Sequence, residues 1–239
     1  MKKLNTTNKI YTGILLLIIL ATAVKLWRYK GWERYYYSSS FSSPGSYPIY
    51  IRNGYFILED GEIESISNSD VNDHRNMAWG DGTGNDPNRK ERLPVKIVFE
   101  YASYRDELFY KDTINLPLDT IRAIFKNVKK TGVNTSLYHS PEIKRLDFVI
   151  GIANKGNVIV WLRGEKFENV LLKHKMIAKE PRGDQTYHGA RLTKKAFLKE
   201  VFYIDSADRE AYRKGLDKDA NYIDTPSSFV KRLNNEYPY

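Results

Sequence analysis

The histidines and their acidic neighbours are the first residues that could perform chemistry. The four histidines are His74, His139, His174 and His188. No two of them are spaced so that one face of a helix would present a pair of metal ligands. Asp73 and His74 have the residue types of an acid–base pair, but no Gly-x-Ser-x-Gly motif supplies a nucleophile. We therefore expect surface histidines, no catalytic residue and no metal site.

A glycine-rich run at residues 80–84 (GDGTG) has the composition of loops that bind phosphate or calcium. A phosphate loop opens a helix, whereas Pro87 follows here within a polar stretch. An EF-hand loop that began at Asp81 would need Glu at its twelfth position, which is Arg92. We expect a loop that binds no cofactor. The alternative is an irregular calcium site made of Asp81, Thr83, Asn85 and Asp86.

The excess positive charge is concentrated at the start of the chain. Net charge is +9, and residues 1–34 hold seven of the 38 Lys and Arg residues but one of the 29 Asp and Glu residues. The rest of the chain is only mildly basic and lacks the clustered footprint of a nucleic-acid-binding protein, so we expect no nucleic-acid partner. The chain also has no cysteine, which excludes disulfides, thiolate catalysis and zinc–thiolate sites.

The basic N-terminal segment, residues 1–34, surrounds an apolar run. Residues 10–24 are uncharged, and an uncleaved anchor of about 17–25 residues is reached over residues 10–27 if Lys25 extends its ammonium to the headgroups. A cleaved signal peptide is the alternative, because Ala21 and Ala23 fit a small-x-small cleavage site. A buried helix of a soluble protein is the third interpretation. We expect a membrane anchor in residues 1–34 and a single domain in residues 35–239.

The segment from Arg92 to Phe125 predicts two strands and a helix that covers them. Apolar residues alternate with polar ones over residues 93–101, the period of a strand with one buried face. A polar turn at residues 104–107 separates this strand from a second one at residues 108–116. Pro117 then opens a helix whose apolar face includes Phe125.

Further strands are expected at residues 47–58, 62–67, 146–152 and 158–162, and helices after Thr193 and Thr225. Residues 167–178 fit either a strand or a short helix, and the strand is favoured. The Asn53-Gly54 pair within residues 47–58 predicts either a hairpin turn or a bulge. This order favours an α+β fold with a mainly antiparallel β-sheet, a covering helix and C-terminal helices, preceded by a membrane-anchor helix. The body from Tyr47 onward is expected to fold without the anchor.

Two polar segments of the domain have the composition of a binding surface. Residues 68–90 form a loop longer than a strand connection needs, and residues 104–107 form a charged turn. Aromatic residues beside Arg are the types that anchor interfaces. The candidate binding residues are Trp79, Asp81, Tyr104, Arg105, Glu107 and Tyr110. The alternative is a solvated turn with local ion pairs, and tryptophans at 79 and 161 that pack in the core or at its rim.

Short motifs of glycine, proline and aromatic residues follow one another between residues 47 and 164. They are Tyr47-Pro48, Gly54-Tyr55, Trp79-Gly80, Leu93-Pro94, Ser103-Tyr104, Glu107 before Phe109-Tyr110, Leu116-Pro117, Gly151-Ile152-Ala153 with Gly156, and residues 160–164 (VWLRG). Their order resembles a family of bacterial envelope proteins known as domain of unknown function 2931, many of whose members look like lipoproteins. The resemblance implies an exported, membrane-attached domain, with no known activity. This chain departs from the lipoprotein members because it has no cysteine to carry lipid.

These observations together favour a membrane-anchored envelope protein that binds a macromolecular partner and does not catalyse a reaction. Immunity-like neutralisation of a partner protein is one form of this function. The domain is expected on the periplasmic or exocytoplasmic side, and a small-molecule ligand is not indicated by any motif. The alternative is an envelope hydrolase that uses Asp73, His74 and Asp81 of the 68–90 loop.

Overall fold

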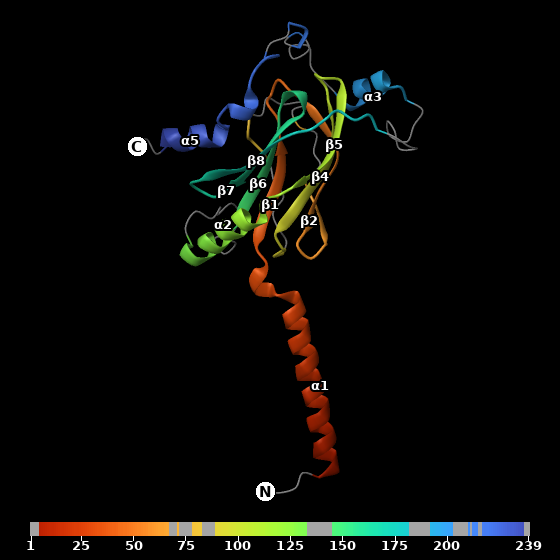
Figure 1. The fold of residues 1–239 in the computed structure, drawn as a ribbon, viewed down its shortest axis with the longest axis vertical. Helices are drawn as coiled ribbons and strands as arrows, with labels where there is room; N and C mark the ends of the chain where they lie inside the picture. The colour runs from red at the N-terminus through yellow and green to blue at the C-terminus, as the bar shows by residue number, and fades with distance from the viewer. Residues whose placement is uncertain are drawn as a thin grey trace. The chain divides into compact units, whose positions relative to one another are not determined.

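The computed structural model describes residues 5–66, 71, 78–82, 89–132, 145–181, 192–202, 210, 212–214 and 217–236. The chain divides into two compact units, Met1–Arg34 and Tyr35–Tyr239. The first unit contains one long helix, and the second contains the β-sheets and the shorter helices (Figure 1).

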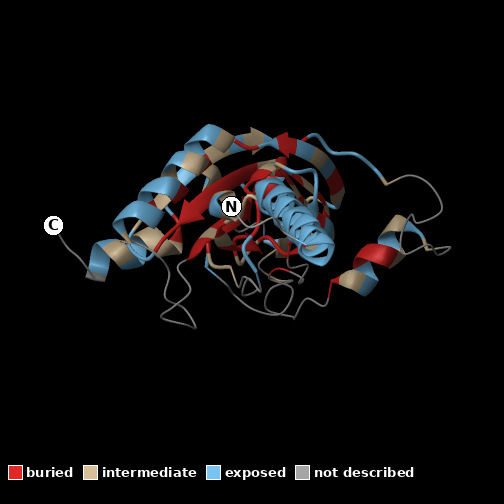
Figure 2. Ribbon diagram, turned by 90° about the horizontal axis from the view of Figure 1, so that it is seen from below, coloured by how far each residue is buried: buried red, intermediate tan, exposed pale blue. Residues whose placement is uncertain are grey.

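The first unit is built on helix α1, Thr6–Tyr29. Asn5 caps its N-terminus by accepting a hydrogen bond from the Asn8 N–H at 2.8 Å, which satisfies an otherwise unpaired helix donor. Every residue of the helix is exposed (Figure 2). It is long and apolar enough to cross a membrane, a test that a signal sequence near the N-terminus also passes. A short 3-10 turn, η1 (Gly31–Glu33), follows.

The second unit contains two four-stranded sheets. The first sheet has the order β1-β6-β7-β8, formed by Tyr36–Ser42, Arg145–Ile152, Asn157–Arg163 and Glu168–Lys175. The second sheet has the order β3-β2-β4-β5, formed by Ile63–Ser65, Ile49–Leu58, Pro94–Ser103 and Leu108–Asn115. β1 and β6 are parallel and the other pairs are antiparallel. The fold is therefore α+β with mainly antiparallel sheets, as the sequence predicted.

The two sheets share one apolar core. The ring of Phe148 on β6 lies 5.3 Å from that of Tyr37 on β1 and 5.5 Å from that of Phe56 on β2. Such edge-to-face aromatic contacts add to the stabilisation that burial itself provides. The core thus joins strands that are distant in the sequence, and Figure 2 shows most strand residues buried.

Helix α2, Leu118–Thr131, packs against the same core. Its buried residues are Ile121, Phe125 and Val128, spaced as one face of a helix. Gly132 ends the helix in the left-handed conformation, with φ of 67°, and its N–H bonds the carbonyl of Val128. The strand–turn–strand–helix segment predicted from Arg92 to Phe125 is thereby confirmed.

Helix α3, Lys194–Val201, packs on part of the outer face of the second sheet. Thr193 caps this helix as expected, because its hydroxyl accepts from the Ala196 N–H at 3.2 Å. The ring of Phe197 lies 5.7 Å from that of Phe109 on β5. A small apolar cluster therefore forms outside the main core.

The outer face of the first sheet is covered by a C-terminal segment that contains η3 (Tyr222–Asp224) and helix α5 (Ser228–Glu236). Trp161 of β7 and Trp79 are buried there with their rings 5.1 Å apart. After β8 the chain crosses to the second sheet, where Ala178 forms a bridge with Tyr110 of β5. This crossing links the edges of the two sheets.

Three features differ from the sequence-based expectations. Residues 36–42 were not predicted to form a strand, yet they form β1, the parallel partner of β6. The strands form two facing sheets where one was expected. The Asn53-Gly54 pair forms no hairpin turn: it lies inside β2 beside a register shift between Ile51 and Asn53, which is the bulge alternative.

Candidate functional site

The turn between β4 and β5 is tightly built. The Ser103 hydroxyl accepts a hydrogen bond from the Asp106 N–H at 3.2 Å, and Glu107 takes a left-handed conformation with φ of 51°. The Asp106 carboxylate accepts from the Lys155 N–H at 3.0 Å, in the β6–β7 turn η2 (Asn154–Gly156). One carboxylate thus ties together a turn from each sheet, which fixes the turn that carries Tyr104 and Arg105.

Arg105 lies among tyrosine rings at this end of the domain. Its guanidinium carbon is 4.8 Å from the centroid of the Tyr47 ring and 5.5 Å from that of Tyr212. Its Nη1 donates to the carbonyl of Ser46 at 3.1 Å. Cation–π contacts of this kind hold a guanidinium in place while it stays charged.

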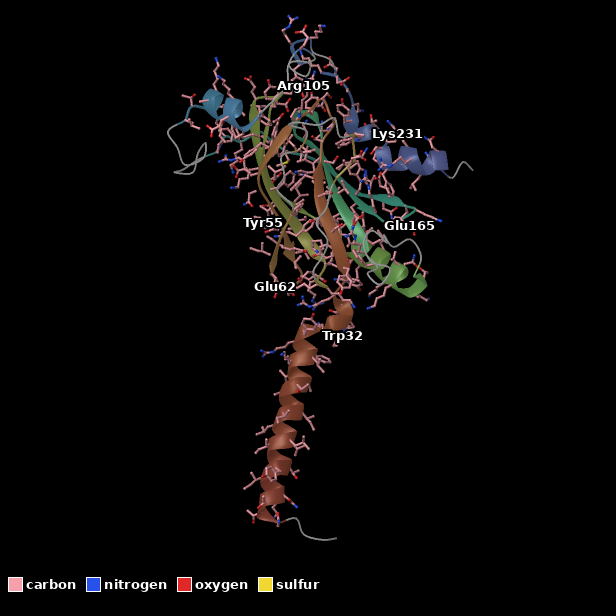
Figure 3. All side chains as sticks on the ribbon, turned by 180° about the vertical axis from the view of Figure 1, so that it is seen from behind. Trp32, Tyr55, Glu62, Arg105, Glu165 and Lys231 are labelled. Carbon is pink, nitrogen blue, oxygen red and sulfur yellow. The ribbon has the colours of Figure 1, made fainter. Side chains whose placement is uncertain are left out.

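Two further tyrosines complete this group, which we call the Arg105 cluster: Tyr47, Tyr104, Arg105, Tyr212 and Tyr222. The ring of Tyr104 lies 5.3 Å from that of Tyr212. The hydroxyls of Tyr222 and Ser46 are 2.7 Å apart, and the ring of Tyr222 is 6.0 Å from that of Tyr47. Figure 3 shows Arg105 at the end of the domain opposite Glu62.

Two tyrosines of the cluster, Tyr47 and Tyr222, stay protonated near neutral pH because their pKa values are raised. Burial raises the pKa of Tyr47, and the positive charge of Arg105 opposes part of that rise. Burial also raises the pKa of Tyr222, with Asp217 adding to the effect while the hydrogen bond to Ser46 opposes it. A neutral phenol both donates and accepts hydrogen bonds. Tyr47 is buried and supports Arg105 from beneath, so the cation and rings that the cluster presents at the surface are those of the half-buried Tyr104, Arg105, Tyr212 and Tyr222.

Tyr110 and Glu107 are placed differently from their neighbours in the turn. Tyr110 is buried on β5, where its ring stacks on that of Tyr101 with centroids 4.9 Å apart. Its hydroxyl donates to Asp106 at 3.3 Å, and burial, followed by the charge of Asp106, raises its pKa. Glu107 is exposed. Tyr110 therefore supports the turn from inside, and Glu107 extends from it.

Trp79 lies in the interior, where only 7% of its surface is exposed. Its indole Nε1–H donates to the carbonyl of Thr225 at 3.2 Å, and its ring contacts Trp161 and Tyr222. The packing interpretation of Trp79 and Trp161 is therefore the one that fits the structure. Trp79 reaches the Arg105 cluster only through Tyr222, whose ring it contacts.

Asp81 is separate from the Arg105 cluster in its contacts and holds the C-terminal helix. Its carboxylate accepts from the hydroxyl of Ser228 and from Arg232 Nη1, the latter at 3.1 Å. The preceding residue, Gly80, has φ of +90°, a conformation that favours glycine. A Cβ on Gly80 would also lie 2.6 Å from that of Ser227. Trp79 and Asp81 thus fasten the segment that covers the first sheet.

Gly80 and Ser227 also contact a buried ion pair, Arg163–Glu168, that was not identified from the sequence. Arg163 Nε and Glu168 Oε2 are 2.5 Å apart, and their side chains are 7% and 4% exposed. The Ser227 hydroxyl donates to Glu168 at 2.8 Å, and Arg163 Nη1 donates to the Gly80 carbonyl at 2.6 Å. Burial lowers the pKa of Arg163, and the charge of Glu168 opposes that shift. Both side chains are buried, and their hydrogen bonds hold Gly80 and Ser227, so these contacts support a structural role.

The residues of the hydrolase alternative are only partly described. Asp73 and His74 lie outside the described residues, as do Thr83, Asn85 and Asp86 of the calcium alternative. Of the histidines, His174 is described, and its Nε2 lies 2.7 Å from Asp112 Oδ2, which joins β8 to β5. Over the described ranges, no group of three or more His, Asp or Glu residues could hold a metal ion.

Of the six predicted binding residues, the structure brings Tyr104 and Arg105 together and places Glu107 beside them. Sequence reasoning did not place Tyr47, Tyr212 or Tyr222 in this group. Tyr47 stands in a short motif with Pro48, which is a signal that could have drawn attention to it. No sequence pattern distinguishes Tyr212 and Tyr222 from the other tyrosines among the 18 in the chain.

Comparison with known proteins supports the resemblance in the sequence. Residues 22–218 match the family described as "Protein of unknown function (DUF2931)". No curated protein and no solved structure matches the chain. The family match begins within α1, includes both sheets and ends before η3. Because it extends over most of the chain, the protein belongs to the DUF2931 family.

Proposed function

We propose that this protein is a membrane-anchored binding module whose contact surface is the Arg105 cluster together with the turn at residues 104–107. The anchor is the segment of residues 10–27 within α1. The observation that carries the proposal is the position of Arg105, held over the ring of Tyr47 and bonded to the Ser46 carbonyl at one end of the domain.

The order built into this end of the domain supports a binding role. Binding costs free energy when flexible side chains become fixed, about 0.5–1.5 kcal/mol for each one. Arg105 is already held by ring contacts and a hydrogen bond, and Tyr104 is packed between Phe202 and Tyr212. Tyrosine and arginine are also the residues that most often dominate interface energies.

The partner we propose is an envelope protein, met on the exocytoplasmic side of the membrane. One form of this function is immunity-like, in which the module neutralises the protein that it binds. A guanidinium surrounded by phenol rings suits a partner surface that offers a carboxylate or carbonyl oxygens together with an apolar side chain. The Arg105 guanidinium would form directional hydrogen bonds with the partner, and the tyrosine rings would provide apolar contact area.

The test is co-purification of crosslinked partners with the full-length protein from membranes. Tyr104→Ala and Arg105→Ala are each expected to weaken capture by about tenfold or more. Tyr55→Ala and Lys231→Ala are matched controls away from the cluster (Figure 3), and they should capture the partner as the parent protein does. Thermal unfolding of each variant shows whether the domain remains folded.

Two results would contradict the proposal. If all four variants are folded and capture the partner equally, the Arg105 cluster is not the contact surface. A hydrolytic activity that disappears in Asp73→Asn or His74→Ala would replace the binding function with the hydrolase alternative.

A further inference from the structure

The end of α1 and the turn that follows it combine basic and aromatic residues. We call the four cations of this segment the basic collar; they are Lys25, Arg28, Lys30 and Arg34. The aromatic residues among them are Trp27, Tyr29 and Trp32. Trp27 is 72% exposed and Trp32 is 55% exposed. Amphipathic rings of this kind collect at membrane–water interfaces.

The chain folds back on itself where the helix ends. Lys30 is in the left-handed conformation, with φ of 46°, and its N–H donates to the Leu26 carbonyl at 3.0 Å. Arg34 returns to the helix end, where its guanidinium lies 4.6 Å from the centroid of the Tyr29 ring and its Nε donates to the Tyr29 carbonyl at 3.1 Å. These contacts hold Arg34 beside the C-terminal end of α1, close to the other cations of the collar.

The charge of this stretch is almost wholly positive. Glu33 is its single acid, and Glu33 Oε2 lies 3.8 Å from Lys30 Nζ, with both side chains about two-fifths exposed. Exposed pairs at this distance contribute little. Lys25 and Arg28 are exposed on the helix. The collar thus retains a net positive charge that any bound surface would have to balance.

The length of the apolar run decides where these cations lie in a bilayer. The uncharged residues 10–24 rise about 22 Å as a helix, whereas the hydrocarbon layer is about 30 Å thick and takes about 20 residues. Leu26 and Trp27 supply apolar length beyond Lys25. The backbone at Lys25 therefore lies at the edge of the hydrocarbon, and its ammonium has to reach outward to the level of the lipid phosphates.

We propose that the basic collar binds the phosphate groups of anionic phospholipids and enriches them around the end of α1. This inference rests on the anchor in the proposed function. A zwitterionic headgroup carries its own cation, whereas an anionic headgroup leaves a phosphate charge for Lys25 and Arg28 to neutralise. Cations at the surface of an anionic membrane favour binding by about fivefold each, and salt weakens the effect.

The test uses the full-length protein in liposomes that contain phospholipids with brominated acyl chains. Bromine quenches nearby tryptophans, so Trp27 and Trp32 report which lipid surrounds the collar. Phosphatidylglycerol and phosphatidylcholine are brominated in separate samples at the same mole fraction. A Trp27→Phe/Trp32→Phe variant gives the background from the buried Trp79 and Trp161. Quenching by brominated phosphatidylglycerol should exceed that by brominated phosphatidylcholine.

The variant that tests the cations is Lys25→Gln/Arg28→Gln, which should lose most of this preference. Lys126→Gln/Lys130→Gln on α2 removes the same charge from exposed positions outside the collar and should keep it. Equal quenching by the two lipids, or an unchanged preference in the collar variant, would overturn the inference while the anchor stands. A protein that does not float with liposomes of either composition would overturn the anchor and the inference together.

Discussion

Trp79 shows how the setting of one residue can depend on the tertiary fold and not on the composition around it. It stands in a polar, glycine-rich stretch, which favours a surface position. The structure buries it against Trp161 and bonds its indole to the Thr225 carbonyl. The bond partner is 146 residues away in sequence, so no local pattern could have indicated it.

Trp79→Ala is expected to destabilise the domain by about 3–5 kcal/mol, because it removes a buried ring and leaves a cavity. Urea unfolding of the full-length protein measures the change. Trp32→Ala, at an exposed position, is the matched control and should change the stability by less than about 0.5 kcal/mol. Similar midpoints for the two variants would mean that Trp79 is not a core residue.

Glu64 provides a pH dependence at the residue scale. Burial raises its pKa, and the hydrogen bond that it accepts from Tyr37 opposes part of the rise. A carboxyl whose folded pKa is raised stabilises the fold below its unfolded pKa of about 4.3, and this contribution is lost as the pH rises through the folded value.

Glu64→Gln should therefore change the pH dependence of stability in a stated direction. The parent protein should gain stability relative to this variant as the pH falls from neutral to about 4. Urea midpoints of both proteins at several pH values give the difference, which removes the contributions of other carboxyls. A difference that is constant across this range would contradict the burial of the Glu64 carboxyl.

At the scale of elements, the strands and helices with a regular apolar period were predictable. β4, β5 and α2 follow the alternation and the helical spacing read from residues 93–132. β1 was missed because its pattern is irregular: Ser38, Ser40 and Ser42 are buried. The Ser38 hydroxyl donates to Asp147, and the Ser42 hydroxyl accepts from the Gly80 N–H at 3.0 Å. A polar strand is stable here because other elements satisfy its hydroxyls.

The candidate site was predictable only in the part that lies between regular strands. The turn at residues 104–107 lies between two regular strands, so its position and its Tyr104 and Arg105 follow from the sequence. The rings around Arg105 come from loops and C-terminal residues whose meeting depends on the tertiary fold. Spacing alone therefore identified the turn and could not identify Tyr47 or Tyr222.

Phe125→Ala tests the packing of α2 against the sheets. The Phe125 ring lies 5.0 Å from that of Tyr35 and 6.2 Å from that of Phe148, so its loss should cost about 3–5 kcal/mol. Lys126→Ala on the exposed side of the same helix should cost less than about 0.5 kcal/mol. Chemical denaturation followed by circular dichroism measures both. If Phe125→Ala were as mild as its control, α2 would not be part of the core.

The whole molecule raises the question of where its folded domain begins. From the sequence, the body from Tyr47 onward is expected to fold without the anchor. The structure adds β1 to that body, since β1 pairs with β6 over seven residues. Tyr37 and Phe41 of β1 are buried in the core. A chain that started at Tyr47 would therefore lack one strand of the first sheet.

Two truncated chains test this boundary. The chain of residues 35–239 is expected to unfold cooperatively, because it keeps both sheets and their shared core. The chain of residues 47–239 would leave the β6 edge unpaired and the core without Tyr37 and Phe41, a loss of several kcal/mol that is comparable with the whole stability of a domain. It should be unfolded or prone to aggregation, since an uncovered strand edge pairs with other chains. Cooperative unfolding of both chains at equal midpoints would show that β1 is dispensable and that the domain begins at β2.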